Sequence, residues 1–246
     1  SDPHLTPRDI MVMVPDVNSY APHVDAVFGR IERGSSRYIP YTLADQGERH
    51  QQPLMIALEM LLSIGQLRIT QTEVLCLLAI PAVQRRFALA ADDIASLQHW
   101  CNDAGARWGL DNTQRAGFGM PANEPTNSWW FALERMILGY AMGAPNDDAQ
   151  PRWQHIEPYH EVAGLSADAA GKLANFISAL NHWWRHSADP VSLTGWAERA
   201  EKLLQTFFAT DTNDPGPDAS QEKERLLLTK LQSELQALQD VAGSLT

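Results

Sequence analysis

The sequence predicts a mainly α-helical domain that follows a short N-terminal strand–helix–strand. Apolar residues have strand-type spacing in Ile10–Val14 and Tyr38–Tyr41, and helix-type spacing dominates after Asp45. A lone strand–helix–strand cannot bury both faces of a parallel sheet. We therefore expect residues 1–45 to begin an incomplete α/β lobe of a longer protein. Residues 46–246 are expected to form a helical domain that ends in a C-terminal helix.

Between the two strands, the spacing predicts one amphipathic helix, capped by Asn18 or Ser19. The apolar face of this helix comprises Val24, Val27, Phe28 and Ile31. Pro40 suits an edge strand better than a central one, because proline cannot donate a backbone hydrogen bond.

Helical periodicity resumes at Pro53, a residue that fits the first turn of a helix. The buried stripe of this helix is expected to be Leu54, Ala57, Leu58, Leu61 and Leu62. Thr70 and Glu73 then have the spacing of a capping box. A further helix has an apolar face made of Ile94, Leu97, Trp100 and Cys101. Gly105 is expected to end it in a left-handed conformation.

Two segments rich in turn-forming residues, Asp111–Asn127 and Gly143–His160, are predicted to be loops. The helix between them has an apolar face made of Trp129 or Trp130, Leu133, Met136, Ile137 and Tyr140. Two more helices are expected around Leu173–Trp184 and Leu193–Phe208. Thr210–Ala219 is predicted to be a linker. The final helix, Gln221–Val241, has an apolar seam that requires a partner, formed by Leu228, Leu231, Leu235 and Leu238.

The composition argues against a membrane protein and against a strongly basic nucleic-acid-binding protein. No apolar run approaches the ~18–20 residues that span a bilayer. The net charge of the 246 residues is −11, so tight unaided binding to phosphate backbones is not expected. Cys76 and Cys101 lie in helical segments without metal-binding spacing, and reduced thiols fit a cytoplasmic protein.

No catalytic motif stands out. The only Gly-Lys pair, Gly171–Lys172, lacks the upstream glycine and the following Ser or Thr of a phosphate-binding loop. Gly117-Phe-Gly119 runs into a proline rather than a helix. Asp92–Asp93 suits the first turn of a helix, where carboxylates satisfy free amides and complement the dipole. We therefore expect no enzymatic activity, no catalytic residues and no cofactor in this chain.

One short segment contains four side chains that could bind a metal ion. These are His155, Glu157, His160 and Glu161. Two prolines interrupt the segment, and its two histidines do not have the i, i+4 spacing of a helical zinc site. A polar surface loop is therefore the favoured interpretation, and no metal site is predicted.

Tryptophan pairs and one arginine pair are the remaining candidates for contact with a nucleic acid. In Trp129–Trp130 and Trp183–Trp184, adjacent side chains point ~100° apart, so one of each pair should reach the core and the other its edge. Edge indoles near an arginine could stack on single-stranded bases, although packing against another domain is commoner. Arg85 and Arg86 are the only adjacent arginines, and they are the DNA-contact candidates.

Several stretches resemble a known family. LTPRDIMVMVPDVNSYAPHVDAVFG at 5–29, RYIPYTLAD at 37–45, NDAGARWGLD at 102–111 and WWFALERMILGYAM at 129–142 are similar to RecC, the gamma chain of bacterial exodeoxyribonuclease V, the RecBCD helicase–nuclease. The resemblance implies that residues 1–45 open a 2A-like lobe of a superfamily 1 helicase. It implies that residues 46–246 form the helical 2B-like accessory domain.

The resemblance also implies a function. RecC proteins resemble helicases but have lost the ATPase motifs. They hold the RecB and RecD subunits together, guide separated DNA strands and take part in recognising the Chi sequence. The resemblance thus implies a non-catalytic DNA-handling and scaffold region acting in double-strand break repair and homologous recombination. Two alternatives remain open: an accessory domain of an active superfamily 1 helicase, and a helical protein-interaction domain without a DNA role.

Overall fold

The fold is given by a computed structural model of the chain. It describes residues 6–7, 10–14, 20, 23–24, 27–28, 31, 35, 37–42, 52–143, 153, 155–162, 164, 167–209 and 219–244. The chain divides into two compact units, Ser1–Leu58 and Glu59–Thr246, which we describe separately. The predicted domain boundary after residue 45 stays a prediction.

The described part of the chain is mainly helical and contains no sheet, which confirms the predicted fold class. Its helices are α3 (Pro53–Leu62), η2 (Ile64–Gln66), α4 (Gln71–Leu78), α5 (Pro81–Arg86), α6 (Ala91–Asp103), α7 (Asn112–Ala116), α8 (Trp129–Met142), α9 (Ala167–Ser187), α10 (Leu193–Phe207) and α11 (Ala219–Ser244). None of the described helices is both long and apolar enough to cross a membrane.

In the first unit, the strand predictions for Ile10–Val14 and Tyr38–Tyr41 are wrong. Both segments are described, and neither pairs with another strand among the described residues. A strand exists only where a second backbone completes its hydrogen bonds, and Met11, Val12 and Met13 here are more than 80% exposed. The helix expected between them is formed at the described positions 23–24 and 27–28. The predicted caps Asn18 and Ser19 lie outside the described residues.

The helix ends of the second unit follow the local signals that the sequence contains. Thr70 and Glu73 form the predicted capping box, in which Thr70 N–H donates to Glu73 Oε2 over 2.6 Å and Glu73 N–H donates to Thr70 Oγ1 over 3.3 Å. Gly105 has a φ of +88°, as expected for a left-handed terminator. The Asp93 carboxylate accepts from Ala90 N–H over 2.9 Å, which confirms the predicted capping role for Asp93.

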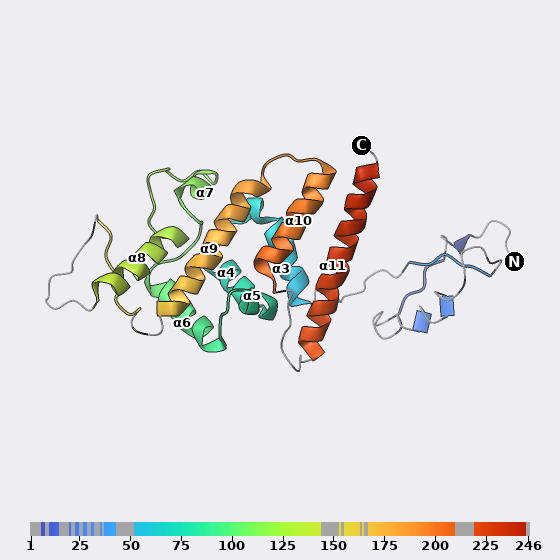
Figure 1. Ribbon diagram of the computed structural model, residues 1–246, viewed down its shortest axis with the longest axis horizontal. Helices are drawn as coiled ribbons and strands as arrows, with labels where there is room; N and C mark the ends of the chain where they lie inside the picture. Colours follow the sequence, from blue (N-terminus) through green and yellow to red (C-terminus); the bar gives the residue numbers. More distant parts are fainter. Residues whose placement is uncertain are drawn as a thin grey trace. The chain divides into compact units, whose positions relative to one another are not determined.

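The helices pack around a shared core in which α9 is central. Figure 1 shows α9, α10 and α11 running side by side. The helices α8 and α6 also contact α9, and they lie toward its lower left in this view. Three phenylalanines join α5, α9 and α10: the Phe176 ring lies 5.0 Å from that of Phe87 and 6.1 Å from that of Phe207. Both contacts are edge-to-face, the arrangement that aromatic quadrupoles favour.

The region 111–127 is not entirely a loop, because it contains the short helix α7. Asp111 caps this helix by accepting from Gln114 N–H over 2.9 Å. Gln114 and Arg115 are buried, and Arg115 Nη1 donates to the carbonyl oxygen of Thr126 over 2.5 Å. Five helical residues with two buried polar side chains depend on such tertiary partners, so periodicity could not reveal them.

The final helix, α11, finds its partner within this chain. It packs against α10 and α5. Leu228 is buried, Leu231 and Leu235 are half-buried, and Leu238 is 40% exposed. The predicted seam is therefore covered best in the N-terminal half of α11. Most of the predicted linker Thr210–Ala219 lies outside the described residues.

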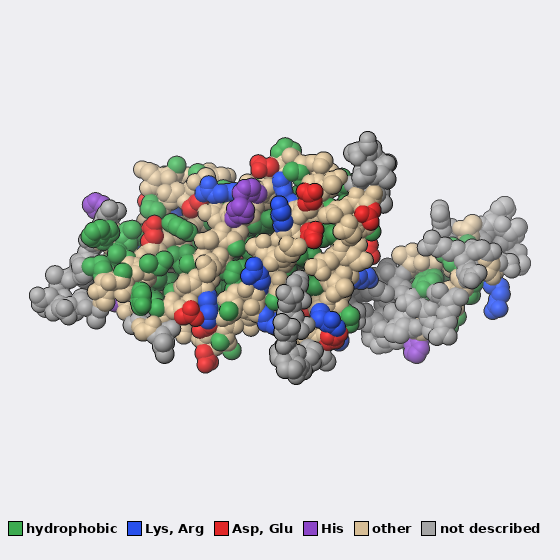
Figure 2. Space-filling model, viewed as in Figure 1, with side chains coloured by type: hydrophobic (Ala, Val, Ile, Leu, Met, Phe, Trp, Pro, Cys, Tyr) green, Lys and Arg blue, Asp and Glu red, His purple; other side chains and the backbone are tan. Residues whose placement is uncertain are grey.

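Each tryptophan pair divides between core and edge as expected. Trp129 and Trp183 are buried and donate from Nε1 to the carbonyl oxygens of Ile69 and Leu61, over 2.8 and 2.6 Å. Trp130 is 45% exposed and Trp184 is half-buried. Figure 2 shows hydrophobic side chains gathered over the α8 end of the second unit. The exposed hydrophobic side chains of α8 include Trp130, Ile137, Tyr140 and Met142.

Candidate functional site

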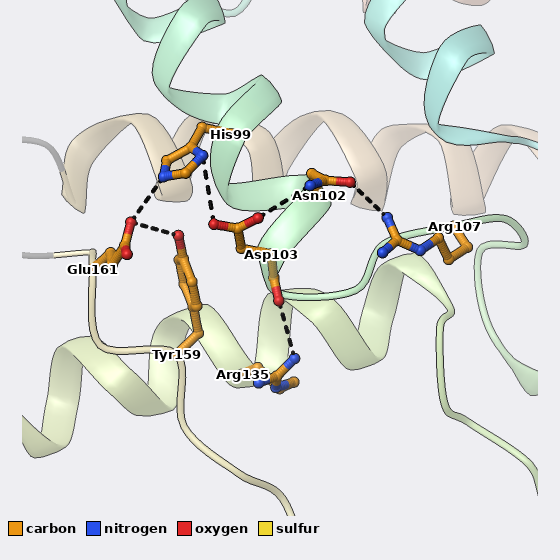
Figure 3. Close-up of polar contacts among 7 residues, drawn as sticks. All are labelled: His99, Asn102, Asp103, Arg107, Arg135, Tyr159 and Glu161. Atoms are coloured by element: carbon orange, nitrogen blue, oxygen red, sulfur yellow. Dashed lines mark hydrogen bonds and ion pairs between the residues drawn. The ribbon is translucent and has the colours of Figure 1, made fainter.

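A polar cluster lies where the C-terminal half of α6 meets the segment 157–161 (Figure 3). His99 stands between two carboxylates: its Nε2 lies 3.0 Å from Glu161 Oε2, and its Nδ1 lies 3.5 Å from Asp103 Oδ2. His99 and Asp103 are four residues apart on one face of α6. Glu161 comes from a different part of the chain, so the fold itself creates this arrangement.

The segment 157–161 is fixed in place by α8. Tyr159 N–H donates to the carbonyl oxygen of Arg135 over 2.9 Å, and Arg135 Nε donates to that of Glu157 over 2.8 Å. The backbone of Tyr159 passes so close to Gly139 that any Cβ there would overlap the Tyr159 carbonyl. Because residue 139 is a glycine, the segment 157–161 can lie against α8, and in this position Glu161 lies beside His99.

Tyr159 supports Glu161 with a hydrogen bond. Its hydroxyl donates to Glu161 Oε2 over 2.9 Å. Burial, the hydrogen bond to Glu161 and the charges of Glu161 and Asp103 raise the pKa of the Tyr159 phenol far above its usual value. Because the phenol stays protonated, it remains a hydrogen-bond donor to Glu161 throughout the physiological pH range.

The arginines drawn in Figure 3 contact neutral oxygen atoms rather than the two carboxylates. Arg135 Nη1 donates to the backbone carbonyl oxygen of Asp103 over 3.4 Å, as drawn in Figure 3, and also to that of Ala104 over 2.8 Å. Arg107 Nη1 donates to Asn102 Oδ1 over 2.9 Å. None of the interactions drawn in Figure 3 pairs an arginine with the carboxylate of Asp103 or of Glu161. Imidazole and carboxylate groups are side chains that coordinate metal ions in proteins.

A second cluster combines arginines with aromatic rings. The Arg68 guanidinium lies 5.4 Å from the ring centre of Trp108 and 6.0 Å from that of Phe118. Arg115, which is buried, lies 4.8 Å from the Trp108 ring. Arg68 is exposed and Phe118 is 37% exposed. An exposed cation beside a partly exposed ring is suited to contacting a phosphate and a base of a single strand.

The predicted DNA-contact residues, Arg85 and Arg86, are both engaged within the protein. Arg85 Nη2 pairs with Glu224 Oε2 on α11 over 2.8 Å, and Glu224 is 7% exposed. Arg86 Nε donates to the carbonyl oxygen of Gln205 on α10 over 3.0 Å. The two arginines thus connect α5 to α10 and α11. Their assignment to DNA stays a prediction.

Of the four side chains that the sequence grouped as possible metal ligands, only Glu161 joins the polar cluster. Glu157 takes part in the nearby contacts through its backbone, as the acceptor for Arg135. Sequence reasoning missed His99 and Asp103. Their i, i+4 spacing on a helix was the available signal, but nothing in the sequence placed Glu161 opposite them.

Comparison with known proteins identifies relatives. The family model described as the RecBCD enzyme subunit RecC fourth domain matches residues 51–244. The RecBCD enzyme subunit RecC of Escherichia coli K12 is 39% identical over 210 residues, which are 85% of this chain and 18% of that protein. The Haemophilus influenzae RecC is 36% identical over 87% of this chain and 18% of its own length. The Mycobacterium tuberculosis H37Rv RecC is 34% identical over 74% of this chain and 16% of its own length.

The chain therefore spans less than a fifth of the length of these three relatives. The family match covers most of the chain and nearly all of the second structural unit, which holds both clusters. On the strength of this match, the chain belongs to the RecC fourth-domain family.

Proposed function

We propose that this chain is a non-catalytic, DNA-handling and scaffold region of a RecC subunit. In this proposal it works within a RecBCD enzyme beside RecB and RecD subunits, in the cytoplasm, in double-strand break repair and homologous recombination. The observation that carries the proposal is the match to the RecC fourth-domain model over residues 51–244. Membership of the RecC family rests on the same match, and the role in handling DNA is what this proposal adds.

The contact with DNA is proposed to be local. Because the net charge is −11, long-range attraction to a phosphate backbone is absent. The cluster of Arg68, Trp108 and Phe118 supplies a short-range alternative, in which an aromatic ring stacks on a base and the guanidinium meets a phosphate. The isolated chain should accordingly bind single-stranded DNA weakly, and neighbouring domains would supply the rest of the surface.

The DNA role can be tested in a RecBCD complex that carries the variants in its RecC subunit. The double variant Arg68→Ala/Phe118→Ala should weaken strand binding about tenfold at low salt, since loss of one stacked base costs ~1–3 kcal/mol. Fluorescence anisotropy with labelled single-stranded DNA measures the affinity. Arg225→Ala, which removes an exposed arginine of α11, is the matched control and should bind like the parent complex. If the parent, the double variant and the control bound the strand equally well, this cluster would not be a DNA contact.

A parallel Arg85→Ala/Arg86→Ala complex tests the sequence-based candidates. Weakened binding together with unchanged thermal stability would favour direct contact with DNA. Loss of stability would instead favour the structural role that the contacts with Glu224 and Gln205 indicate.

The non-catalytic part of the proposal has its own test. The isolated chain should hydrolyse neither ATP nor DNA, because the sequence contains no phosphate-binding loop for the first reaction and no recognisable pair of catalytic carboxylates for the second. A phosphate-release assay with and without DNA measures the first activity, and a labelled-DNA degradation assay measures the second. Turnover that co-purifies with the chain and is missing from a mock preparation would contradict the proposal.

A further inference from the structure

We propose that His99 and Glu161 are the direct ligands of a divalent transition-metal ion of the zinc class, with Asp103 as a positioning residue. One ligand atom from each of these three side chains lies within 4.8 Å of the other two. An imidazole nitrogen combined with carboxylate oxygens suits Zn²⁺ better than Mg²⁺, which prefers oxygen ligands alone. This site lies outside the proposed DNA contact and does not depend on it.

The distance between the two direct ligands fits one shared metal ion. Zinc bonds to nitrogen and to carboxylate oxygen are ~2.0–2.2 Å long, so two ligand atoms at an angle near 90–110° lie about 3.0–3.4 Å apart. His99 Nε2 and Glu161 Oε2 are separated by 3.0 Å. With those two bonds formed, water would complete the coordination, because both side chains are more than half exposed.

Each direct ligand also has an outer partner. Metal-bound histidines usually donate their second ring N–H to a carboxylate, which fixes the ring and increases its basicity. Asp103 Oδ2 lies 3.5 Å from His99 Nδ1, and it would accept that proton once the contact shortens to hydrogen-bond length. Tyr159 donates its hydroxyl to Glu161. Each proposed ligand therefore has one neighbouring side chain that can orient it.

Charge favours a dication at this place. With a neutral imidazole, the two carboxylates give the cluster a charge of −2, and the nearby arginines contact other oxygens. The competing interpretation is a protonated His99 that bridges both carboxylates without a metal. The two interpretations differ in one measurable respect: only the first makes the stability of the chain depend on zinc.

Zinc and cobalt binding to the full chain, freed of metal with a chelator, tests the proposal. Isothermal titration with Zn²⁺ should show saturable binding of one ion that excess Mg²⁺ does not displace. Co²⁺ should give visible absorption bands that Zn²⁺ removes. Zn²⁺ should also raise the melting temperature, because an ion that binds only the folded state stabilises it.

Variants locate the ion. His99→Ala and Glu161→Gln should abolish the binding and the zinc-dependent rise in melting temperature, and Asp103→Asn should weaken the affinity about tenfold. His182→Ala is the matched control, since His182 is an exposed histidine on another helix, α9, with His186 four residues later. It should retain the cobalt spectrum. Circular dichroism confirms that each variant is folded.

Two results would overturn the proposal. One is the absence of zinc binding to the parent chain at millimolar concentration. The other is unchanged binding in the His99→Ala chain, which would place the ion elsewhere.

Discussion

At the scale of single residues, two glycines on neighbouring helices differ in whether their surroundings leave room for a side chain. A Cβ at Gly139 on α8 would overlap the backbone carbonyl of Tyr159, whereas a Cβ at Gly171 on α9 would meet no atom within 4 Å. Gly139→Ala should therefore displace the segment that carries Glu161 and reduce the free energy of unfolding by about 3 kcal/mol. Urea denaturation followed by circular dichroism measures this free energy.

Gly171→Ala is the matched control for the same substitution in a helix. It should increase the free energy of unfolding by about 0.5–1 kcal/mol, because alanine loses less backbone entropy than glycine on folding. If Gly139→Ala were as well tolerated as Gly171→Ala, the close approach of Tyr159 would be disproved.

The two cysteines should differ in reactivity and in their effect on alkaline stability. Burial raises the pKa of the Cys101 thiol to about 12, while Cys76 is exposed. In the unfolded chain a thiol ionises near pH 8.5, so above that pH the folded state retains a proton that the unfolded state has lost. The contribution of Cys101 to stability is therefore complete below about pH 8.5 and is lost as the pH rises toward 12.

Cys101→Ala should reduce the alkaline loss of stability, which unfolding curves recorded at pH 8 and pH 10 would measure. Thiol labelling of the native chain at pH 8 should modify Cys76 quickly and Cys101 only after unfolding. Rapid labelling of both thiols in the folded chain would contradict the burial of Cys101.

At the scale of single elements, α4 depends on its N-terminal cap. Thr70→Ala removes the hydroxyl that accepts from Glu73 N–H and should reduce the free energy of unfolding by about 1 kcal/mol. Thr229→Ala, on the exposed surface of α11, removes a hydroxyl that is not a cap and should cost much less. Thermal denaturation of both variants measures the difference, and equal losses would show that the capping box contributes nothing specific.

At the scale of the whole molecule, the second unit is joined by interactions between residues far apart in sequence. Lys172 of α9 pairs with Asp93 of α6 over 3.0 Å, and Arg85 of α5 pairs with Glu224 of α11 over 2.8 Å. Glu224 is 7% exposed, so loss of its charge leaves the Arg85 guanidinium without its carboxylate partner in a partly buried place. This pair is therefore expected to hold α11 against the remaining helices.

Glu224→Gln should reduce the free energy of unfolding by about 1–3 kcal/mol. Glu234→Gln is the matched control, because Glu234 lies on the exposed face of the same helix, and it should change the free energy by less than about 0.5 kcal/mol. Urea denaturation measures both variants. Equal effects would show that the Arg85–Glu224 pair does not anchor α11.

The sequence by itself determined the helical class, most helix positions and several helix ends, because periodicity and capping are local properties of the chain. It also predicted that one tryptophan of each pair would be buried and the other would lie at the edge, since adjacent helical residues point in different directions, but only the structure showed that the buried ones are Trp129 and Trp183. The helix α7 was missed because its stability depends on buried tertiary hydrogen bonds of Gln114 and Arg115. The predicted strands Ile10–Val14 and Tyr38–Tyr41 have no strand partner among the described residues, and a strand requires one.

Only the tertiary structure decided which polar side chains meet. Glu161 lies 62 residues from His99 in the sequence, and its position depends on a glycine in a third segment that lets one backbone pass close to another. Arg85 was a DNA-contact candidate because Arg85 and Arg86 are the only adjacent arginines, and the fold supplied Glu224 as its partner from 139 residues away. Contacts over such separations depend on how complete helices pack, and no local pattern of residues specifies that packing.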